Sequence, residues 1–297
     1  MRHFGAATRS LCPGRGAQAP SFRRALAPGD GGRGEGKGGT ALHLGRGSTE
    51  DPGGISGGTL VLTVNFNLFE IRDGDRFLDV GCGEGRHSYE AYRLNNGSGV
   101  TCAMDLDDLC LRKTKYVLDH MDQQSGSNGN RNVLCGDALN LPFKDASFDK
   151  ILCAEVMEHV DDPDQGIEEI VRVLKPGGLL AVTVPTYVPE KTCWILDSDY
   201  YNHPGGHVRI FTAQGLVKML RRHNLRVYAI RYEHAFHSIY WTLRCIFGLK
   251  NEEARVPAIY LRFLEMQIVT KSRFVSWVER ILNFFFPKSI VIYTRKI

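Results

Sequence analysis

The sequence predicts an α/β fold in which most strands of one sheet run parallel. From residue 60 onward, short apolar runs alternate with helix-length amphipathic segments, which is the pattern of repeated strand–helix–strand units. A glycine-rich turn follows the first of these runs. The composition, with 43% hydrophobic and 24% charged residues, is that of an ordinary globular protein and excludes collagen and wholesale disorder.

Each predicted strand is a short run of mostly apolar residues, and turn-forming or polar residues mark most of the ends. In chain order the predicted strands are Arg76–Val80, Val100–Met104, Asn132–Cys135, Phe148–Ala154, Leu179–Val184, Arg226–Tyr232 and Ser289–Arg295. The predicted helices are Arg86–Leu94, Asp107–Met121, Asp162–Leu174 and Thr212–His223. Pro176-Gly177-Gly178 is a typical stop signal just beyond the third helix, and Thr212 is a suitable N-cap for the fourth.

Residues 1–58 differ from the rest of the chain. They hold 16 of the 32 glycines and eight Lys/Arg against four Asp/Glu, and they show neither a helical nor a strand period. Because glycine loses the most entropy on ordering, we expect this Gly/Arg-rich segment to be disordered. Its arginine-rich start also resembles a transit peptide in part, and a third interpretation has the working protein begin near Leu60. We expect a cytoplasmic protein, with a mitochondrial location as the alternative.

Residues 59–297 form one predicted domain with an insert at 233–288. The insert holds 11 of the 29 aromatic residues, and eight Lys/Arg against five Glu. Helical spacing in Arg255–Lys271 and Phe274–Phe286 predicts a helical insert before the last strand. Three interpretations stay open: a lid or wall for an apolar substrate, an interfacial helix in weak contact with a membrane surface, and a cap packed on its own core.

Charge and cysteine usage argue against several classes of protein. The net charge of +4 is accounted for by residues 1–58, so the remaining chain is near neutral and no nucleic-acid partner is expected. None of the eight cysteines forms a C-x-x-C pair, which argues against zinc-ribbon and thioredoxin-like sites and favours buried free thiols. No apolar run approaches the ~18 residues of a membrane-spanning helix.

A glycine turn and two acidic strand ends together indicate a nucleoside site. Asp79 to Gly85 reads D-V-G-C-G-E-G, with G-x-G-x-G spacing rather than the dinucleotide pattern G-x-G-x-x-G. Asp105 ends the second strand, where a carboxylate accepts hydrogen bonds from ribose hydroxyls. Asp137 follows the third strand and is able to accept one from an exocyclic amine. Because ligands of such sheets bind at the carboxyl ends of the strands, these groups are expected to meet.

These motifs, with S-F-D-K-I-L-C-A-E-V-M-E-H-V and V-L-K-P-G-G further along, resemble those of the class I S-adenosylmethionine-dependent methyltransferases of the small-molecule type. The resemblance covers residues 60–232 and the last strand. It implies a Rossmann-like sheet of seven strands, of which only the last is antiparallel. It also implies S-adenosylmethionine as the methyl donor.

The resemblance further implies roles for individual residues. The donor's methionine part is assigned to the turn that contains Asp79, Gly81, Cys82, Gly83 and Gly85. Asp105 is expected to hold the ribose, and Leu106 to contact the adenine. Asp137 and Ala138 are expected to read the adenine edge, and Glu155 to border the donor pocket.

Two histidines are the candidate catalytic residues. His159 lies in Glu155-Val156-Met157-Glu158-His159, directly after the fourth strand, and its ordinary pKa suits proton transfer from an acceptor hydroxyl. His207 precedes the Thr212 helix and is expected to line the acceptor pocket. The alternatives are that each histidine only shapes its loop. The E-x-x-E-H run resembles one associated with a divalent cation, but we expect no metal here.

The predicted function is methyl transfer from S-adenosylmethionine to a small, apolar or aromatic acceptor, on oxygen or carbon. One alternative is a nicotinamide-dependent oxidoreductase on a similar sheet. Another is a donor-binding scaffold of the same fold without catalysis. The acceptor and the oligomeric state are not indicated by the sequence.

Overall fold

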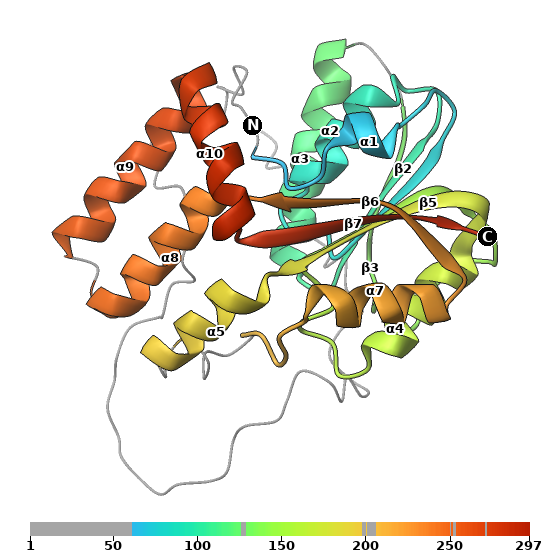
Figure 1. Cartoon of the computed structure of the whole chain (residues 1–297). Helices are drawn as coiled ribbons and strands as arrows, with labels where there is room; N and C mark the ends of the chain where they lie inside the picture. The colour runs from blue at the N-terminus through green and yellow to red at the C-terminus, as the bar shows by residue number, and fades with distance from the viewer. Residues whose placement is uncertain are drawn as a thin grey trace, which may run out of the picture.

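The computed structural model describes residues 61–125, 129–197, 200, 206–249, 251, 254–270 and 272–297. The predicted disorder of residues 1–58 therefore lies outside the described residues. Elements are numbered in Figure 1.

One seven-stranded sheet forms the centre of the domain, in the order β3-β2-β1-β4-β5-β7-β6. The strands are β1 Arg76–Val80, β2 Val100–Asp105, β3 Asn130–Cys135, β4 Phe148–Ala154, β5 Leu174–Pro185, β6 Leu225–Glu233 and β7 Ser289–Lys296. β1 to β5 pair in parallel, and β7 pairs antiparallel with both β5 and β6. The predicted topology, with only the last strand reversed, is confirmed.

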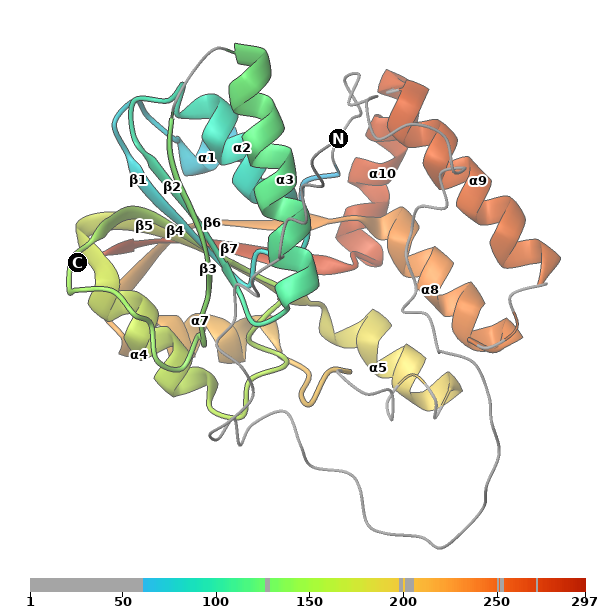
Figure 2. The same cartoon turned by 180° about the vertical axis from the view of Figure 1, so that it is seen from behind.

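Helices cover both faces of this sheet (Figures 1 and 2). On one face lie α1 Phe66–Phe69, α2 Arg86–Leu94 and α3 Asp108–Ser125, and on the other lie α4 Pro163–Val173 and α7 Ala213–Arg222. Beyond the carboxyl ends of the parallel strands lie α5 Tyr187–Leu196, α8 Ala235–Phe247, α9 Arg255–Thr270 and α10 Arg273–Phe285. The insert is thus placed at the edge of the sheet where ligands of α/β proteins bind.

The alternation of side chains along the strands divides the core in two. In β1, Phe77 packs in a cluster with α1, whereas Leu78 and Val80 pack in the cluster that includes Ile167 of α4 and Leu216 of α7. Both faces are covered, so these strands read as nearly continuous apolar runs, as expected for a parallel sheet.

Two sequence assignments need correction. The segment after β5 contains helix α5, which was not predicted because its apolar and polar residues do not separate clearly onto two faces. β5 begins at Leu174, not at Leu179, because Leu174 already has extended backbone angles and pairs with Phe148. The Pro176-Gly177-Gly178 stretch therefore interrupts the start of a strand instead of only ending a helix.

The insert is helical, as predicted, and it has a core of its own. Phe236 and Tyr240 of α8, Leu264 of α9 and Val278 of α10 belong to one apolar cluster, separate from those of the sheet. Its two ends meet, because Glu233 and Ser289 are register partners in the β6–β7 pair. This packing agrees with the interpretation of the insert as a cap. Within the described residues, no helix is long and apolar enough to cross a membrane.

Candidate active site

A cavity of about 1060 Å³ opens at the carboxyl ends of β1, β2, β3 and β4. Its volume is at the upper end of the roughly 300–1,000 Å³ of typical small-molecule pockets. Eight of the ten predicted donor-site residues line it: Gly81, Cys82, Gly83, Asp105, Leu106, Asp137, Ala138 and Glu155.

Two of the predicted donor-site residues, Asp79 and Gly85, are not part of the cavity wall itself. They lie behind it and support the turn that forms the wall. The other predicted donor residues come from four separate strand ends, so the fold brings together groups that are up to 74 residues apart, from Gly81 to Glu155.

The glycine turn after β1 needs glycine for two different reasons. Gly81 has φ +71°, and a Cβ there would lie 2.2 Å from Cγ2 of Val156. Gly83 has φ +52°, but a Cβ there would meet nothing within 4 Å. Gly81 therefore permits close packing against the segment after β4, whereas Gly83 keeps the backbone open toward the cavity. An open glycine backbone of this kind allows a ligand to approach closely.

Asp105 holds the glycine turn and the end of β2 together. Its Oδ2 accepts a hydrogen bond from the Gly83 N–H at 2.7 Å, and its Oδ1 accepts one from the Asp107 N–H at 2.9 Å. Each carboxylate oxygen has a further lone pair, so both can accept another hydrogen bond from a ligand in the cavity. The arrangement suits the two adjacent hydroxyls of a ribose.

The remaining wall residues follow β2, β3 and β4. Asp137 Oδ1 accepts a hydrogen bond from the Leu139 N–H at 2.9 Å, which fixes the turn that also presents Ala138. Leu106 is 45% exposed, and such an apolar side chain in the cavity wall suits contact with a flat ring. Glu155 has a left-handed backbone, with φ +57°, and its Oε1 accepts a hydrogen bond from Thr183 Oγ1 at 2.8 Å.

Asp79 is placed differently from the sequence expectation. Side chains alternate along a strand, so Asp79 shares the face of Phe77 and points toward α2. Its Oδ2 accepts a hydrogen bond from Ser88 Oγ at 2.6 Å, and the side chain is buried. Burial raises the pKa of Asp79 to about 7, and the neighbouring charge of Asp105 adds to this rise. Asp79 therefore supports the turn from behind.

We expect the free energy of unfolding to depend less on pH in the Asp79→Asn variant than in the wild-type protein. The folded state keeps a proton on Asp79 up to about pH 7, whereas the unfolded chain loses it near pH 4. The free energy of unfolding of the wild type should therefore fall as the pH rises through this window, by up to a few kcal/mol (about 1.4 kcal/mol per pKa unit).

The measurement is the thermal unfolding midpoint without ligand at pH 5 and at pH 8. Asparagine carries no charge at either pH. The unfolding midpoint of the variant minus that of the wild type should therefore be larger at pH 8 than at pH 5. Asp73→Asn, at an exposed position, is the matched control and should follow the wild type. Equal pH dependence in wild type and Asp79→Asn would show that the burial of this carboxyl costs nothing.

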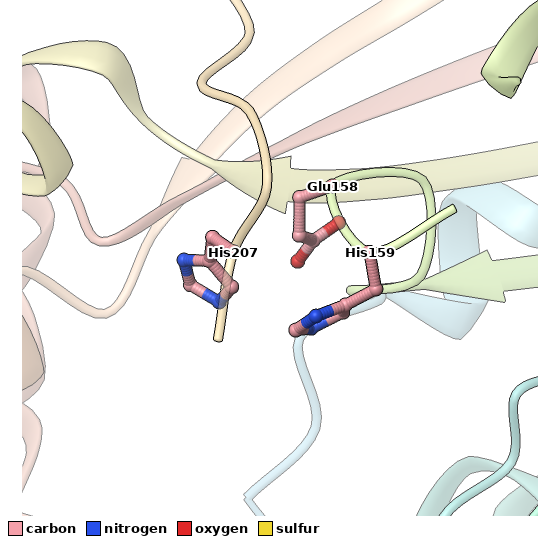
Figure 3. Close-up of side chains that lie close together, drawn as sticks. All are labelled: Glu158, His159 and His207. Carbon is pink, nitrogen blue, oxygen red and sulfur yellow. The ribbon is translucent and has the colours of Figure 1, made fainter. Parts of the chain in front are cut away.

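The two candidate histidines lie side by side although 48 positions separate them in the chain (Figure 3). Their ring centroids are 4.9 Å apart. His159 lines the cavity, and its Nδ1 is 3.3 Å from the carbonyl oxygen of Gly206. Burial lowers the pKa of His159, and the neighbouring His207 lowers it further. His159 is therefore a neutral imidazole near neutral pH. His207 does not line the cavity and lies behind His159.

Glu158 completes this group. Its carboxylate and the two imidazoles offer ligand atoms within 4.8 Å of one another, as Figure 3 shows. The side chain is fully buried, and its oxygens have no hydrogen-bond partner within the part of the chain that the structure describes. Burial, together with the nearby Glu155, raises the pKa of Glu158 well above its ordinary value. Glu155 does not belong to this group. Of the two glutamates in the E-x-x-E-H run, only Glu158 has a carboxylate close to both histidines.

Sequence reasoning does not identify Glu190, the partner of His207. Glu190 lies in the first turn of α5, and its Oε1 is 2.5 Å from Nδ1 of His207. It also accepts hydrogen bonds from Trp194 and Tyr200. Burial tends to raise the pKa of Glu190, but the hydrogen bond and charge of His207, together with Lys288 and Tyr200, outweigh it and leave that pKa lowered. No motif marks Glu190, and only the recognition of α5 would have suggested it.

The cavity also has a basic rim, which the sequence analysis does not predict. Arg86 at the start of α2, and Arg112, Lys113 and Tyr116 on α3, line the cavity. Arg112 pairs with Asp108, and Lys113 pairs with Glu84. Lys113 and Tyr116 lie one and four positions after Arg112, so the three side chains share one side of the helix. This spacing is the sequence signal from which the rim could have been predicted.

Comparisons with known proteins show what kind of domain this chain resembles. Residues 78–182 match the family described as a methyltransferase domain. The O-methyltransferase rstn1 of Aspergillus nomiae is 32% identical over 126 residues, which cover 41% of this chain and 52% of that protein. A ubiquinone/menaquinone biosynthesis C-methyltransferase, UbiE of Pseudomonas paraeruginosa, is 35% identical over 130 residues, which cover 43% and 49%. The chain spans about half the length of these curated relatives.

Solved structures agree on the fold. A SAM-dependent methyltransferase from Methanosarcina mazei has a TM-score of 0.53 and 18% identity, with 80% of this chain and 99% of that chain covered. Residues 78–182 therefore match a methyltransferase domain, and the sheet with its reversed last strand has the fold of the solved methyltransferase.

Proposed function

We propose that the protein transfers a methyl group from S-adenosylmethionine to a small apolar or aromatic acceptor, on oxygen or carbon. The observation that carries this proposal is the position of His159. It lines the same cavity as Gly83 and Asp105, so a proton acceptor and the residues proposed to bind the donor share one cavity.

The residues of the cavity fit the donor. The open backbone at Gly83 leaves room for the methionine part, and the free lone pairs of Asp105 suit the ribose hydroxyls. Leu106 and Ala138 offer apolar contact to the adenine, and Asp137 offers a carboxylate to its amino group. When bound, S-adenosylmethionine supplies an electrophilic methyl group on its sulfonium. The protein contributes mainly by positioning, which supplies up to about 7–11 kcal/mol in well-oriented reactions.

His159 has the correct tautomer for a general base. A carbonyl oxygen only accepts hydrogen bonds, so the contact with Gly206 assigns the proton of the neutral ring to Nδ1. Nε2 then keeps its lone pair and is able to take the proton from an acceptor hydroxyl. Because burial keeps the ring neutral, His159 is ready for this step near neutral pH.

His207 is better described as a positioning residue than as the base. Its Nδ1 hydrogen-bonds to Glu190, which fixes the ring beside His159. A charged His207 would raise the cost of protonating His159, whereas a neutral one supports its orientation by contact. His207 is not among the residues of the cavity wall, and its place in the acceptor pocket stays a prediction.

The proposed acceptor class follows from the cavity wall near His159. Val156 and Val160 lie there, and Leu139 and Ala154 add further apolar surface. Such a wall favours an apolar or aromatic acceptor over a charged one, because it gives a charge no hydrogen-bond partner. One of the two relatives is named as an O-methyltransferase and the other as a C-methyltransferase. Methylation of oxygen and methylation of carbon are therefore both compatible with this proposal.

The first test is thermal unfolding of the full chain with S-adenosylhomocysteine or NAD. A ligand at about 100 times its Kd stabilises the folded state by about 2.7 kcal/mol, which raises the unfolding midpoint by roughly 5–10 °C. We expect this rise with S-adenosylhomocysteine and none with NAD. A rise with NAD alone would instead support the oxidoreductase.

Transfer of a labelled methyl group to a panel of phenols and apolar carbon acids is the second stage. Label should appear in an acceptor of this kind and not in charged analogues of the same size. Donor binding without transfer to any member of a broad panel would contradict the proposal and support a non-catalytic scaffold.

A further inference from the structure

Helix α10 has two apolar faces, of which only one is packed. Val275, Val278 and Leu282 contact the apolar cluster that α10 shares with α8 and α9. The opposite face holds five large apolar side chains, here called the outer stripe: Phe274 (70% exposed), Trp277 (57%), Ile281 (43%), Phe284 (82%) and Phe285 (70%). Their spacing of three, four, three and one positions keeps them on one side of the helix.

Basic residues accompany the outer stripe. Arg273 and Arg280, seven positions apart, are both exposed and lie along one edge of it. The acidic residue of α10, Glu279, is turned inward and accepts a hydrogen bond from Gln267 of α9. The exposed surface of the described α10 therefore combines aromatic rings with positive charge and carries no acidic side chain.

A hollow of about 290 Å³ lies at the edge of the outer stripe and is lined by Arg273, Ser276, Trp277 and Arg280. Guanidinium groups and a hydroxyl are suitable donors to phosphate oxygens, because arginine presents its N–H groups in a planar fork. The indole of Trp277 borders the same hollow. Tryptophan is enriched at membrane interfaces, where one part of the ring is in apolar surroundings and the other in polar ones.

We propose that the outer stripe binds the surface of a membrane that contains anionic phospholipid, with Arg273 and Arg280 on the lipid phosphates. α10 has 13 residues, so it is about 20 Å long, which suits a helix lying in the plane of the interface. Monomeric proteins rarely expose an apolar patch of this kind without a partner. The basic edge and the arginine-lined hollow favour lipid over a second protein.

α9 adds to the same exposed side of the insert. Ile259, Met266 and Val269 are exposed, as are Arg255 and Arg262. Glu265 is the exposed acid of this helix and opposes binding to anionic lipid. Two exposed arginines against one exposed glutamate leave α9 with a net positive face. Figures 1 and 2 show α9 on the outer side of the insert, with α10 between α9 and the ends of β6 and β7.

The test is co-sedimentation of the full chain with vesicles of phosphatidylcholine, with or without phosphatidylglycerol, at low and high salt. We expect binding to the anionic vesicles that weakens at high salt. Phe284→Ser should weaken it by roughly tenfold, which is about 1.4 kcal/mol. The Arg273→Gln/Arg280→Gln variant should weaken it by about 25-fold on anionic vesicles, at roughly fivefold per arginine, and little on neutral ones.

Ile297→Ser is the matched control, because Ile297 is 80% exposed and ends the chain at the opposite side of the domain. It should bind vesicles like the wild type. Brominated lipid should quench the fluorescence of the wild type, and Trp277→Phe should lose most of this quenching. All variants should keep the midpoint rise with S-adenosylhomocysteine, so a failure of donor binding is recognised separately.

Two results would overturn the proposal. One is the absence of wild-type binding to anionic vesicles at low salt. The other is equal binding by Phe284→Ser and Ile297→Ser. Light scattering identifies the competing explanation: a wild-type dimer that becomes a monomer in Phe284→Ser would assign the outer stripe to a second copy of the chain instead of lipid.

Discussion

Replacing Asp105 by alanine is expected to abolish high-affinity donor binding. Hydrogen bonds to charged groups contribute roughly 1.5–3 kcal/mol each, so the loss of two ribose contacts should weaken binding by about two to four orders of magnitude. The variant also loses the acceptors of the Gly83 and Asp107 N–H groups, which hold the turn against β2. Isothermal titration with S-adenosylhomocysteine measures the effect directly.

A second variant separates the two roles of Asp105. Asp105→Asn keeps one oxygen, which is able to anchor Gly83 or accept from the ribose, so its affinity should fall between those of the wild type and Asp105→Ala. Asp73→Ala removes an exposed carboxylate outside the cavity and should bind like the wild type. Wild-type affinity in a folded Asp105→Ala protein would exclude Asp105 from the ribose site.

Replacing His159 by alanine is expected to lower turnover while leaving donor affinity nearly unchanged. General base catalysis by a positioned side chain is typically worth about 10²- to 10⁴-fold in rate. His159 is the histidine that lines the cavity on the side of Val156 and Val160, so the loss should appear in kcat with a hydroxyl acceptor. Donor titration on the same variant provides the comparison.

The pH dependence of the rate distinguishes this role from a structural one. A base must be deprotonated to act, and the pKa of His159 is below its ordinary value of about 6.5. The rate of the wild type should therefore rise with pH to a plateau, with a midpoint below 6.5. This rise should disappear in His159→Ala. His207→Ala, which removes only the supporting contact, should keep the rise with a shifted midpoint. Unchanged kcat in His159→Ala would make the residue structural.

Much of the fold was predictable because its signals are local. The β1 run ends at a glycine turn, and the strand ends at Asp105 and Asp137 are marked by acidic residues that follow apolar ones. These signals depend on neighbouring residues, so one sequence is enough to find them. The donor wall followed from the rule that parallel strands end at one edge.

The acceptor side was less predictable because it depends on contacts between distant segments. Glu190 reaches His207 only because α5 and the segment before α7 meet in the fold, and no local pattern records this. Asp79 shows a second limit of local signals. Its glycine-rich neighbours indicate a ligand contact, whereas the alternation of side chains along β1 puts it on the face of Phe77.

The meeting of Glu233 and Ser289 has a consequence for how such a protein diversifies. The Lys288 N–H donates to the Glu233 carbonyl, and Asn283 Oδ1 accepts from the Ala235 N–H, so the insert leaves and rejoins the sheet at one closed neck. The free energy of closing a loop grows only slowly with its length. Helices α8 to α10 can therefore be lengthened, shortened or exchanged without disturbing the donor half, so the surface that carries the outer stripe can change while the cavity stays constant.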